Sequence, residues 1–103
     1  FLVIMTRTRS YRKKATKLAW AVNRWFPQYP ALVDSMRDRH MRYNRTRDWI
    51  FEQERLGRAY IFAPHRMPIG NGTRKLNELA ETYEAGLAQA REEIPLIKRF
   101  LGL

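Results

Sequence analysis

Residues 1–14 read FLVIMTRTRSYRKK, an apolar run that ends in a cluster of cations. The five large apolar residues at its start suit a strand that is covered on both faces, as the strands of parallel sheets are. The cations begin directly after Thr6, and no acid lies among them. In open α/β sheets ligands bind at the carboxyl ends of the strands. The sequence therefore indicates a first candidate site at Thr6.

The composition sets outer limits on the kind of protein. A chain of 103 residues, of which 45% are apolar, is the size of one ordinary domain. The absence of cysteine excludes disulfides and cysteine-based zinc sites, and it permits a cytosolic location. No apolar run approaches the roughly 18 residues of a membrane span. Because the chain begins inside a strand-like run without methionine, we expect a single segment of a longer protein. The lack of cysteine and of a membrane span predicts a cytoplasmic location, at most peripheral to a membrane.

The formal net charge of +10 lies almost entirely in the first half of the chain. Residues 1–50 carry 12 arginines or lysines against 3 acids, whereas residues 51–103 carry 8 against 7. Arginine outnumbers lysine 15 to 5, which favours bidentate contacts to phosphate or carboxylate. This asymmetry predicts an anionic partner, either nucleic acid or a phospholipid surface. The alternative is that the cations pair with acids elsewhere in a longer protein.

Hydrophobic periodicity predicts two helices after the first strand. Thr16 is expected to cap a short helix that ends before Pro27. A second, longer helix is expected to begin at Tyr29-Pro30, since proline is favoured in the first turn. It should run to Leu56, where Gly57 supplies a left-handed cap.

Residues 59–63 (AYIFA) form a second predicted strand, which Pro64 ends. A strand, two helices and a strand make a crossover, which normally joins parallel strands. Two parallel strands alone are implausible as a stable sheet. The fold class is therefore predicted as α/β, with two parallel strands at the edge of a larger sheet and long helices packed on it.

The rest of the chain is predicted as a turn-rich loop over residues 64–72 and a third helix capped by Thr73. Pro95 is expected to break or kink that helix. Its apolar residues recur at helical spacing and are expected to face the core: Leu76, Leu79, Ala80, Tyr83, Leu87, Ala90 and Ile94.

No catalytic motif is present, so the sequence does not identify this chain as an enzyme. The two serines, Ser10 and Ser35, are not flanked by glycine, which excludes a nucleophile elbow. Gly70 and Gly72 form a lone GxG that indicates an ordinary turn. With only two histidines and no cysteine, neither a metal site nor a cofactor is predicted.

Three groups of residues remain as candidates. The basic arm, residues 7–14, offers contacts to anionic lipid or phosphate through Arg7, Arg9, Tyr11, Arg12, Lys13 and Lys14. The long helix offers structural anchors in Arg39, His40, Tyr43 and Asn44, and mid-helix Asn44 is expected to hold the basic arm. For His40 a satisfied core residue is favoured over a catalytic base. The aromatics Trp20, Trp25, Trp49 and Phe51 interleave with arginines, and at helical spacing a core role is favoured over stacking on bases.

The sequence resembles the C-terminal region of bacterial patatin-like phospholipases over nearly its whole length. The first matching features are an apolar strand leading into T-R-x-x-x-Y-R-K, then Tyr29-Pro30, then R-H-x-x-Y-N. In this chain they are Thr6, Arg7, Tyr11, Arg12 and Lys13, followed by Arg39, His40, Tyr43 and Asn44. Further along, the likeness continues through Pro64, Pro68-Ile69, Arg74, Leu76, Tyr83 and Gly86.

The resemblance implies a function for the parent protein rather than for these residues. In that family a serine in GxSxG and an aspartate in D-G-[GA] hydrolyse lipid esters, and both motifs lie upstream of this region. Residues 1–6 would be a late strand of the catalytic sheet, and residues 7–103 an appended α/β region without catalytic residues. The upstream catalytic domain is then the expected partner, with an anionic phospholipid surface as a second one.

Two alternatives stay open. A small basic nucleic-acid-binding module would explain the cationic half and the excess of arginine. A pure scaffold would use the arginines of the basic arm to pair with acids of the upstream domain.

Overall fold

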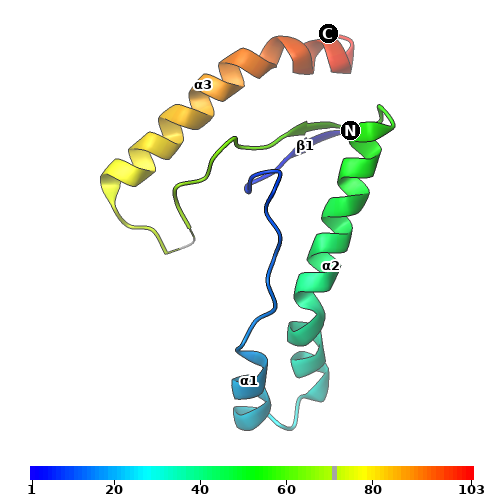
Figure 1. Cartoon of the computed structure of the whole chain (residues 1–103), viewed down its shortest axis with the longest axis vertical. Coiled ribbons are helices and arrows are strands. Elements are labelled where there is room, and N and C mark those ends of the chain that lie inside the picture. Colours follow the sequence, from blue (N-terminus) through cyan, green and yellow to red (C-terminus); the bar gives the residue numbers. More distant parts are fainter. Residues whose placement is uncertain (71) are drawn as a thin grey trace. The chain divides into compact units, whose positions relative to one another are not determined.

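The computed structural model describes residues 1–70 and 72–103 (Figure 1). Its elements follow in the predicted order of strand, helix, helix, strand and helix, so the mixed α/β class is confirmed. They are β1 (Leu2–Ile4), α1 (Ala19–Trp25), α2 (Pro30–Arg55), β2 (Tyr60–Phe62) and α3 (Leu76–Leu101). The chain divides into two compact units, each considered separately below. Unit 1 comprises residues 1–11 and 53–103, and unit 2 comprises residues 12–52.

Unit 1 is built on β1 and β2, which pair in parallel as predicted. In their register Leu2 lies opposite Tyr60 and Ile4 lies opposite Phe62. The ladder continues past β1, where the N–H of Met5 donates to the carbonyl oxygen of Phe62 at 2.8 Å. Within the described residues these two strands form the whole sheet, so the larger sheet that the sequence predicts is not shown.

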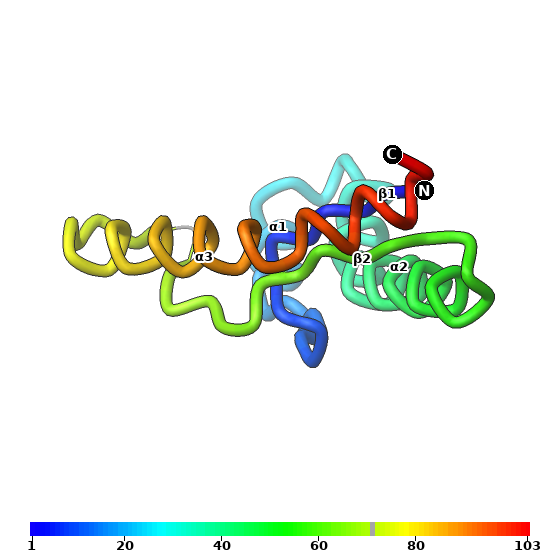
Figure 2. The backbone as a smooth tube through the Cα atoms, turned by 90° about the horizontal axis from the view of Figure 1, so that it is seen from above, coloured from blue at the N-terminus to red at the C-terminus, as the bar shows by residue number. Residues whose placement is uncertain are grey.

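Helix α3 passes over the two strands (Figure 2). The rings of Tyr60 on β2 and Phe100 near the end of α3 are in contact, with centroids 6.0 Å apart. The hydroxyl of Tyr60 also donates a hydrogen bond of 2.8 Å to Glu93 on α3. The buried apolar residues of unit 1 are few and small or β-branched, namely Ala59, Ile61 and Ala63. The core of unit 1 is therefore thin and lies around β2.

The predicted inner stripe of α3 is wrong. Of its large members, Leu76, Leu79, Tyr83 and Ile94 are exposed and only Leu87 is half-buried, whereas the buried residue of α3 is Gln89. The helix meets the strands through a face of small and polar side chains instead, and its apolar periodicity points to solvent. Among the described residues of unit 1, most of that apolar stripe is uncovered.

The start of α3 also differs from the one expected. Lys75, not Thr73, precedes the first turn, and the Thr73 hydroxyl accepts a hydrogen bond from the N–H of Gly70 instead. Pro95 lies inside the helix, which continues to Leu101. Gly102 ends it in the left-handed conformation at φ 76°, which glycine adopts without steric cost. The predicted loop before α3 includes Asn71, which lies outside the described residues.

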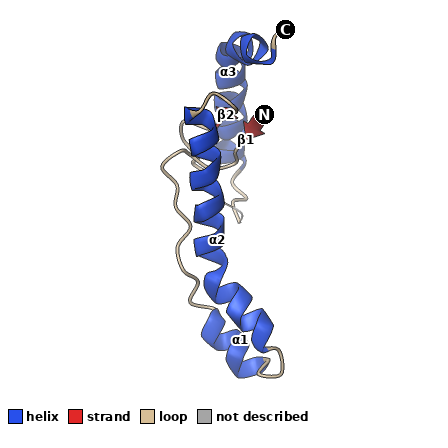
Figure 3. Cartoon of the chain, turned by 90° about the vertical axis from the view of Figure 1, so that its right-hand side faces the viewer, coloured by secondary structure: helices blue, strands red, loops and turns tan. Residues whose placement is uncertain are grey.

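In unit 2, α1 lies beside the first turns of α2 (Figures 1 and 3). Thr16 does not cap α1, because its hydroxyl accepts from the N–H of Leu18, which itself precedes the first helical residue. Helix α2 begins at Pro30 as predicted and ends at Arg55, shortly before Gly57 at φ 74°. No helix in residues 1–70 or 72–103 combines the length and the apolar character that crossing a membrane requires.

Candidate functional site

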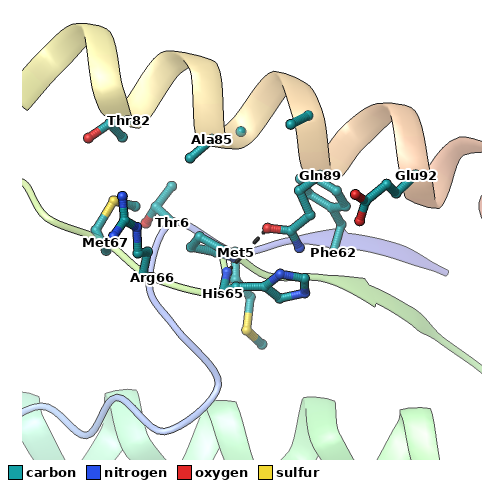
Figure 4. A pocket seen from close by; sticks show the side chains of 13 residues that line it. Met5, Thr6, Phe62, His65, Arg66, Met67, Thr82, Ala85, Gln89 and Glu92 are labelled. Carbon is teal, nitrogen blue, oxygen red and sulfur yellow. Dashed lines mark hydrogen bonds between the residues drawn. The ribbon is translucent and has the colours of Figure 1, made fainter.

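A cavity of about 440 Å³ opens in unit 1 at the carboxyl ends of β1 and β2, beneath α3 (Figure 4). The strand exits line it with Met5, Thr6 and Phe62, together with residues 64–67. Across from them α3 presents mainly small residues, among which a Cβ added at Gly86 would meet nothing within 4 Å. The short side chains of α3 therefore keep the space open. Thr6, which the sequence indicated as the first candidate site, is part of its wall.

The side chain of Gln89 ties this cavity to the exit of β2. Its Nε2 donates 2.7 Å to the carbonyl oxygen of Ala63, and its Oε1 accepts from the N–H of His65 at 3.2 Å. Nε2 also donates to Glu93 Oε1 at 2.9 Å, one turn further along α3. Sequence reasoning missed Gln89 because it looked only at apolar periodicity. The signal that could have found it is the polar spacing of Gln89 and Glu93 on one helix face.

Several polar side chains of the cavity are already engaged in contacts of their own. Its hydroxyls belong to Thr6 and Thr82, and the Thr82 hydroxyl donates into its own helix at the carbonyl oxygen of Glu78. At its rim the Arg66 guanidinium forms an ion pair with Glu81. Among residues 1–70 and 72–103, no three histidines, cysteines or acids gather as metal ligands. A mostly apolar wall with a polar rim suits an apolar group that carries a polar end.

Tyr60 is the titratable group that this environment alters. Burial, the hydrogen bond to Glu93 and the negative charge of that carboxylate together raise the pKa of Tyr60 above its usual value, although Arg9 opposes the shift. The neutral phenol is therefore favoured in the folded state. Tyr60 acts here as a hydrogen-bond donor that joins β2 to α3.

The part of the basic arm that belongs to unit 1 is engaged within that unit. Arg9 Nη1 lies 2.8 Å from Glu54 Oε2, and its Nη2 donates 3.3 Å to the carbonyl oxygen of Ile61 on β2. The guanidinium of Arg7 lies over the ring of Tyr11, 5.1 Å from its centroid. Arg9 thus has a structural role, whereas Arg7 and Tyr11 form a cation–π pair at the surface.

The part of the basic arm in unit 2 runs along α2. Arg12 forms an ion pair with Asp48 at 2.5 Å, and the ammonium of Lys13 lies 5.2 Å from the centroid of the Tyr43 ring. Asn44 binds the backbone of Lys13 twice, accepting from its N–H at 2.8 Å and donating to its carbonyl oxygen at 2.9 Å. This two-point contact is the geometry expected of an anchor. Lys14 is exposed.

The other two predicted anchors do not share this contact. Arg39 is exposed on α2. Nδ1 of His40 is buried and makes no hydrogen bond with the described residues. The structure therefore brings Tyr43 and Asn44 to the basic arm, and leaves His40 with neither an orienting carboxylate nor a nucleophile at that nitrogen.

The predicted core role of the tryptophans is wrong. Trp20 is 68% exposed and Trp25 is 69% exposed, and Trp49 on α2 is exposed as well. Phe51 is half-buried beneath the guanidinium of Arg47, 5.3 Å from its ring centroid. Helical spacing indicated a buried face, but α1 buries its alanines instead.

Comparison with known protein families places a match in the second and larger part of the chain. Residues 29–102, which span α2, β2 and α3, match the model of a domain of unknown function, DUF6363. Residues 1–28 precede the matched region, and they include β1, the basic arm and α1. No curated protein and no solved structure matches the chain.

Proposed function

This chain belongs to the DUF6363 family, and we propose that it is the non-catalytic C-terminal segment of a patatin-like lipid acyl hydrolase. In this role it completes the edge of the catalytic sheet. The resemblance to that family, which runs over nearly the whole chain, supplies the enzyme class. The observation that carries the structural part is the open edge of β1.

The backbone of β1 is paired on one side. The carbonyl oxygen of Phe1 and the N–H of Met5 are bonded to β2. Because backbone groups alternate along a strand, those of Leu2 and Ile4 face away from β2. A row of such unpaired groups is a template for another strand.

At the opposite edge of this small sheet, a backbone group of β2 is already bonded to a side chain. The carbonyl oxygen of Ile61 on β2 accepts from Arg9, and the ion pair with Glu54 holds that guanidinium in place. Covering an edge with a charged side chain is a common way to prevent strand addition. Further strands would therefore join at β1, with β2 at the edge of the complete sheet.

Exposed apolar surface supports the same arrangement. Phe1 is 78% exposed and Ile4 is 69% exposed, although parallel strands are usually covered on both faces. The uncovered stripe of α3 adds Leu76, Tyr83 and Ile94 to this surface. Apolar area of this extent normally marks an interaction surface. A catalytic domain that packs on β1 and on the exposed side of α3 would bury this apolar area.

In this proposal the ester is hydrolysed by the upstream serine and aspartate, and the present residues take no chemical step. The cavity at Thr6 lies at the carboxyl ends of the strands, where it would help to shape the region that holds the acyl chain. The ion pairs of Arg9 and Arg12 support a structural use of those two cations. Arg7, Lys13 and Lys14 would then face anionic head groups.

The test uses the full-length protein with a proline at the open edge. Ile4→Pro removes an N–H that faces away from β2, so the pairing of β1 with β2 is kept while an added strand loses a hydrogen bond. We expect the free energy of unfolding to fall by about 1–3 kcal/mol, the cost of a buried backbone acceptor that has lost its donor, and the release of fatty acid from phospholipid to fall with it. Ile4→Val, which keeps the N–H, is the matched control and should change neither.

Two results would overturn the proposal. One is a full-length protein that releases no fatty acid from phospholipid or from simple esters. The other is an Ile4→Pro variant as stable and as active as Ile4→Val, since β1 would then have no strand at its open edge.

A nucleic-acid-binding module remains the second candidate, because α2 exposes Arg37, Arg39, Arg42 and Arg45. Titration of a DNA duplex at rising salt distinguishes it. Such a module loses affinity with a log–log slope of about 0.9 per phosphate contacted. A steep slope together with no esterase activity would favour this second function.

A further inference from the structure

Helix α1 has an inverted pattern of burial. It buries the small side chains of Ala19 and Ala21 and exposes the two largest, Trp20 and Trp25, by more than two thirds each. Tryptophan is normally among the more buried residue types, because its ring carries a large apolar area. A helix of a soluble protein would place these residues the other way round. The pattern indicates that the tryptophans meet a surface outside unit 2.

Three neighbours of the tryptophans extend this exposed area. Leu18 precedes α1, and Phe26 and Tyr29 lie in the turn that leads to α2; all three are exposed. We call these five side chains the α1 surface: Leu18, Trp20, Trp25, Phe26 and Tyr29. One tryptophan alone carries about 150–250 Å², so this short segment exposes a large apolar area. At 3.6 residues per turn Trp20 and Trp25 lie about 140° apart around α1, so the area is spread over two sides of the helix.

The charge around the α1 surface has a single sign. Residues 12–29 contain five cations and no acid. Arg12 is paired with Asp48, whereas Lys14, Lys17 and Arg24 are exposed. An apolar surface surrounded by exposed cations is complementary to a partner that is apolar within and anionic at its boundary.

The type of cation separates the possible partners. Arginine is enriched in protein–protein interfaces, but lysine is depleted there. Although lysine is the rarer cation in this chain, three of its five lysines fall in residues 12–29. Clusters of lysine beside tryptophan and tyrosine are instead typical of segments that lie at the interface of anionic membranes.

We propose that the α1 surface is a membrane-contact site, which inserts Trp20 and Trp25 at the head-group level of an anionic phospholipid bilayer while Lys14, Lys17 and Arg24 bind the head groups. Trp and Tyr side chains suit this depth because each joins an apolar ring to a polar N–H or O–H. The site lies on α1 rather than on the arginines of the basic arm, two of which are held in ion pairs. The inference deepens the proposed function, on which it rests only in naming the membrane as the surface that bears the substrate.

The experiment measures co-sedimentation of the full-length protein with vesicles of phosphatidylcholine and phosphatidylglycerol in equal parts, and with vesicles of phosphatidylcholine alone. Trp20→Ser/Trp25→Ser is expected to lower the partition coefficient on anionic vesicles about 10-fold or more, because two interfacial rings are lost. The matched control is Trp49→Ser, which removes a tryptophan that is also exposed, at 59%, but lies outside the α1 surface, and it should leave binding unchanged. Circular dichroism and the thermal midpoint of all three proteins should agree, because none of these side chains is buried.

A second pair of variants tests the charge. Lys14→Glu/Lys17→Glu is expected to reduce binding to anionic vesicles by on the order of 25-fold or more, at roughly fivefold per cation near a charged membrane. Lys75→Glu/Lys98→Glu makes the same change in net charge at the other end of the chain, in unit 1, and should have little effect.

The proposal is overturned if the wild-type protein binds neither kind of vesicle, or if each substitution pair acts no more strongly than its control. Tryptophan variants that keep vesicle binding but change the oligomeric state would assign the α1 surface to a protein partner and overturn it too. The readout is independent of hydrolysis. If the protein does not bind vesicles but Ile4→Pro lowers stability and activity, the proposed function stands and the membrane site does not. If vesicle binding depends on the α1 surface but Ile4→Pro has no effect, the membrane site stands and the proposed function does not.

Discussion

Gln89 and Ala63 join helix α3 to the exit of strand β2: the side-chain Nε2 of Gln89 donates a hydrogen bond of 2.7 Å to the carbonyl oxygen of Ala63. Gln89 is buried, and its Oε1 accepts from the N–H of His65 two residues further on. One amide thus satisfies two backbone groups at the point where β2 ends. The thin apolar core of unit 1 makes such polar contacts a large part of what orders α3 on the strands.

Gln89→Leu tests this contact. It leaves a carbonyl and an N–H without partners next to an apolar side chain of similar size, so the free energy of unfolding should fall by about 2–4 kcal/mol. Urea denaturation followed by circular dichroism measures the change. Asn77→Leu, at an exposed position on the same helix, should alter the value by less than about 0.5 kcal/mol. Equal stability of the two variants would contradict a structural role for Gln89.

Tyr60 predicts a loss of stability in alkali. Its pKa is raised in the folded state, chiefly by burial and by the hydrogen bond to Glu93, so above the ordinary tyrosine pKa near 10 the unfolded chain loses its proton first. Stability from Tyr60 is therefore complete below about pH 10 and declines as the pH rises through the folded pKa. Urea midpoints measured from neutral pH to pH 11 should fall less steeply in Tyr60→Phe than in the wild type. Parallel profiles would show that the phenol is not perturbed.

Two glycines are expected to respond to alanine with opposite signs. Gly86 lies inside α3 and an added Cβ meets nothing within 4 Å, so Gly86→Ala should raise the free energy of unfolding by about 0.5–1 kcal/mol. Gly102 has φ 76° at the end of the same helix, so Gly102→Ala should lower it by about 1 kcal/mol. Thermal or urea unfolding of the two variants provides the comparison. A destabilised Gly86→Ala would contradict the open space beside Gly86.

Asn44 should control the proteolysis of the basic arm. Asn44→Ala removes both hydrogen bonds to the Lys13 backbone, which then becomes available to a protease as an extended segment. Cleavage by trypsin after Lys13 or Lys14 should become roughly tenfold faster, as expected when about 1.4 kcal/mol of local stability is lost. Asn44→Asp keeps the acceptor for the Lys13 N–H, so its rate of cleavage should lie between those of the wild type and Asn44→Ala. Asn23→Ala replaces an exposed asparagine on α1 and serves as the control.

The sequence alone determined the class, the order and most boundaries of the elements. Pro30 and Gly57 mark the ends of α2, and Pro64 follows β2, because proline and glycine act through the backbone of their own residue. The β-branched and apolar runs at both strands predicted parallel pairing through a crossover, and β1 and β2 pair in that way. The two-point contact of Asn44 with Lys13 was also anticipated, since a mid-helix asparagine needs a partner for its amide.

Only the tertiary structure decided which helix faces are buried. Hydrophobic periodicity finds an apolar stripe, but it does not say whether the surface that covers the stripe belongs to the same chain. On α3 the side chain of Tyr83 is exposed and the face with Gln89 meets the exit of β2, because the Gln89 amide is bonded to the backbone of Ala63 and His65. On α1 the alanines pack and the tryptophans do not, which is a property of the neighbouring elements and not of the spacing. Local backbone rules therefore set the elements, while contacts between residues far apart in the sequence set the exposed surfaces.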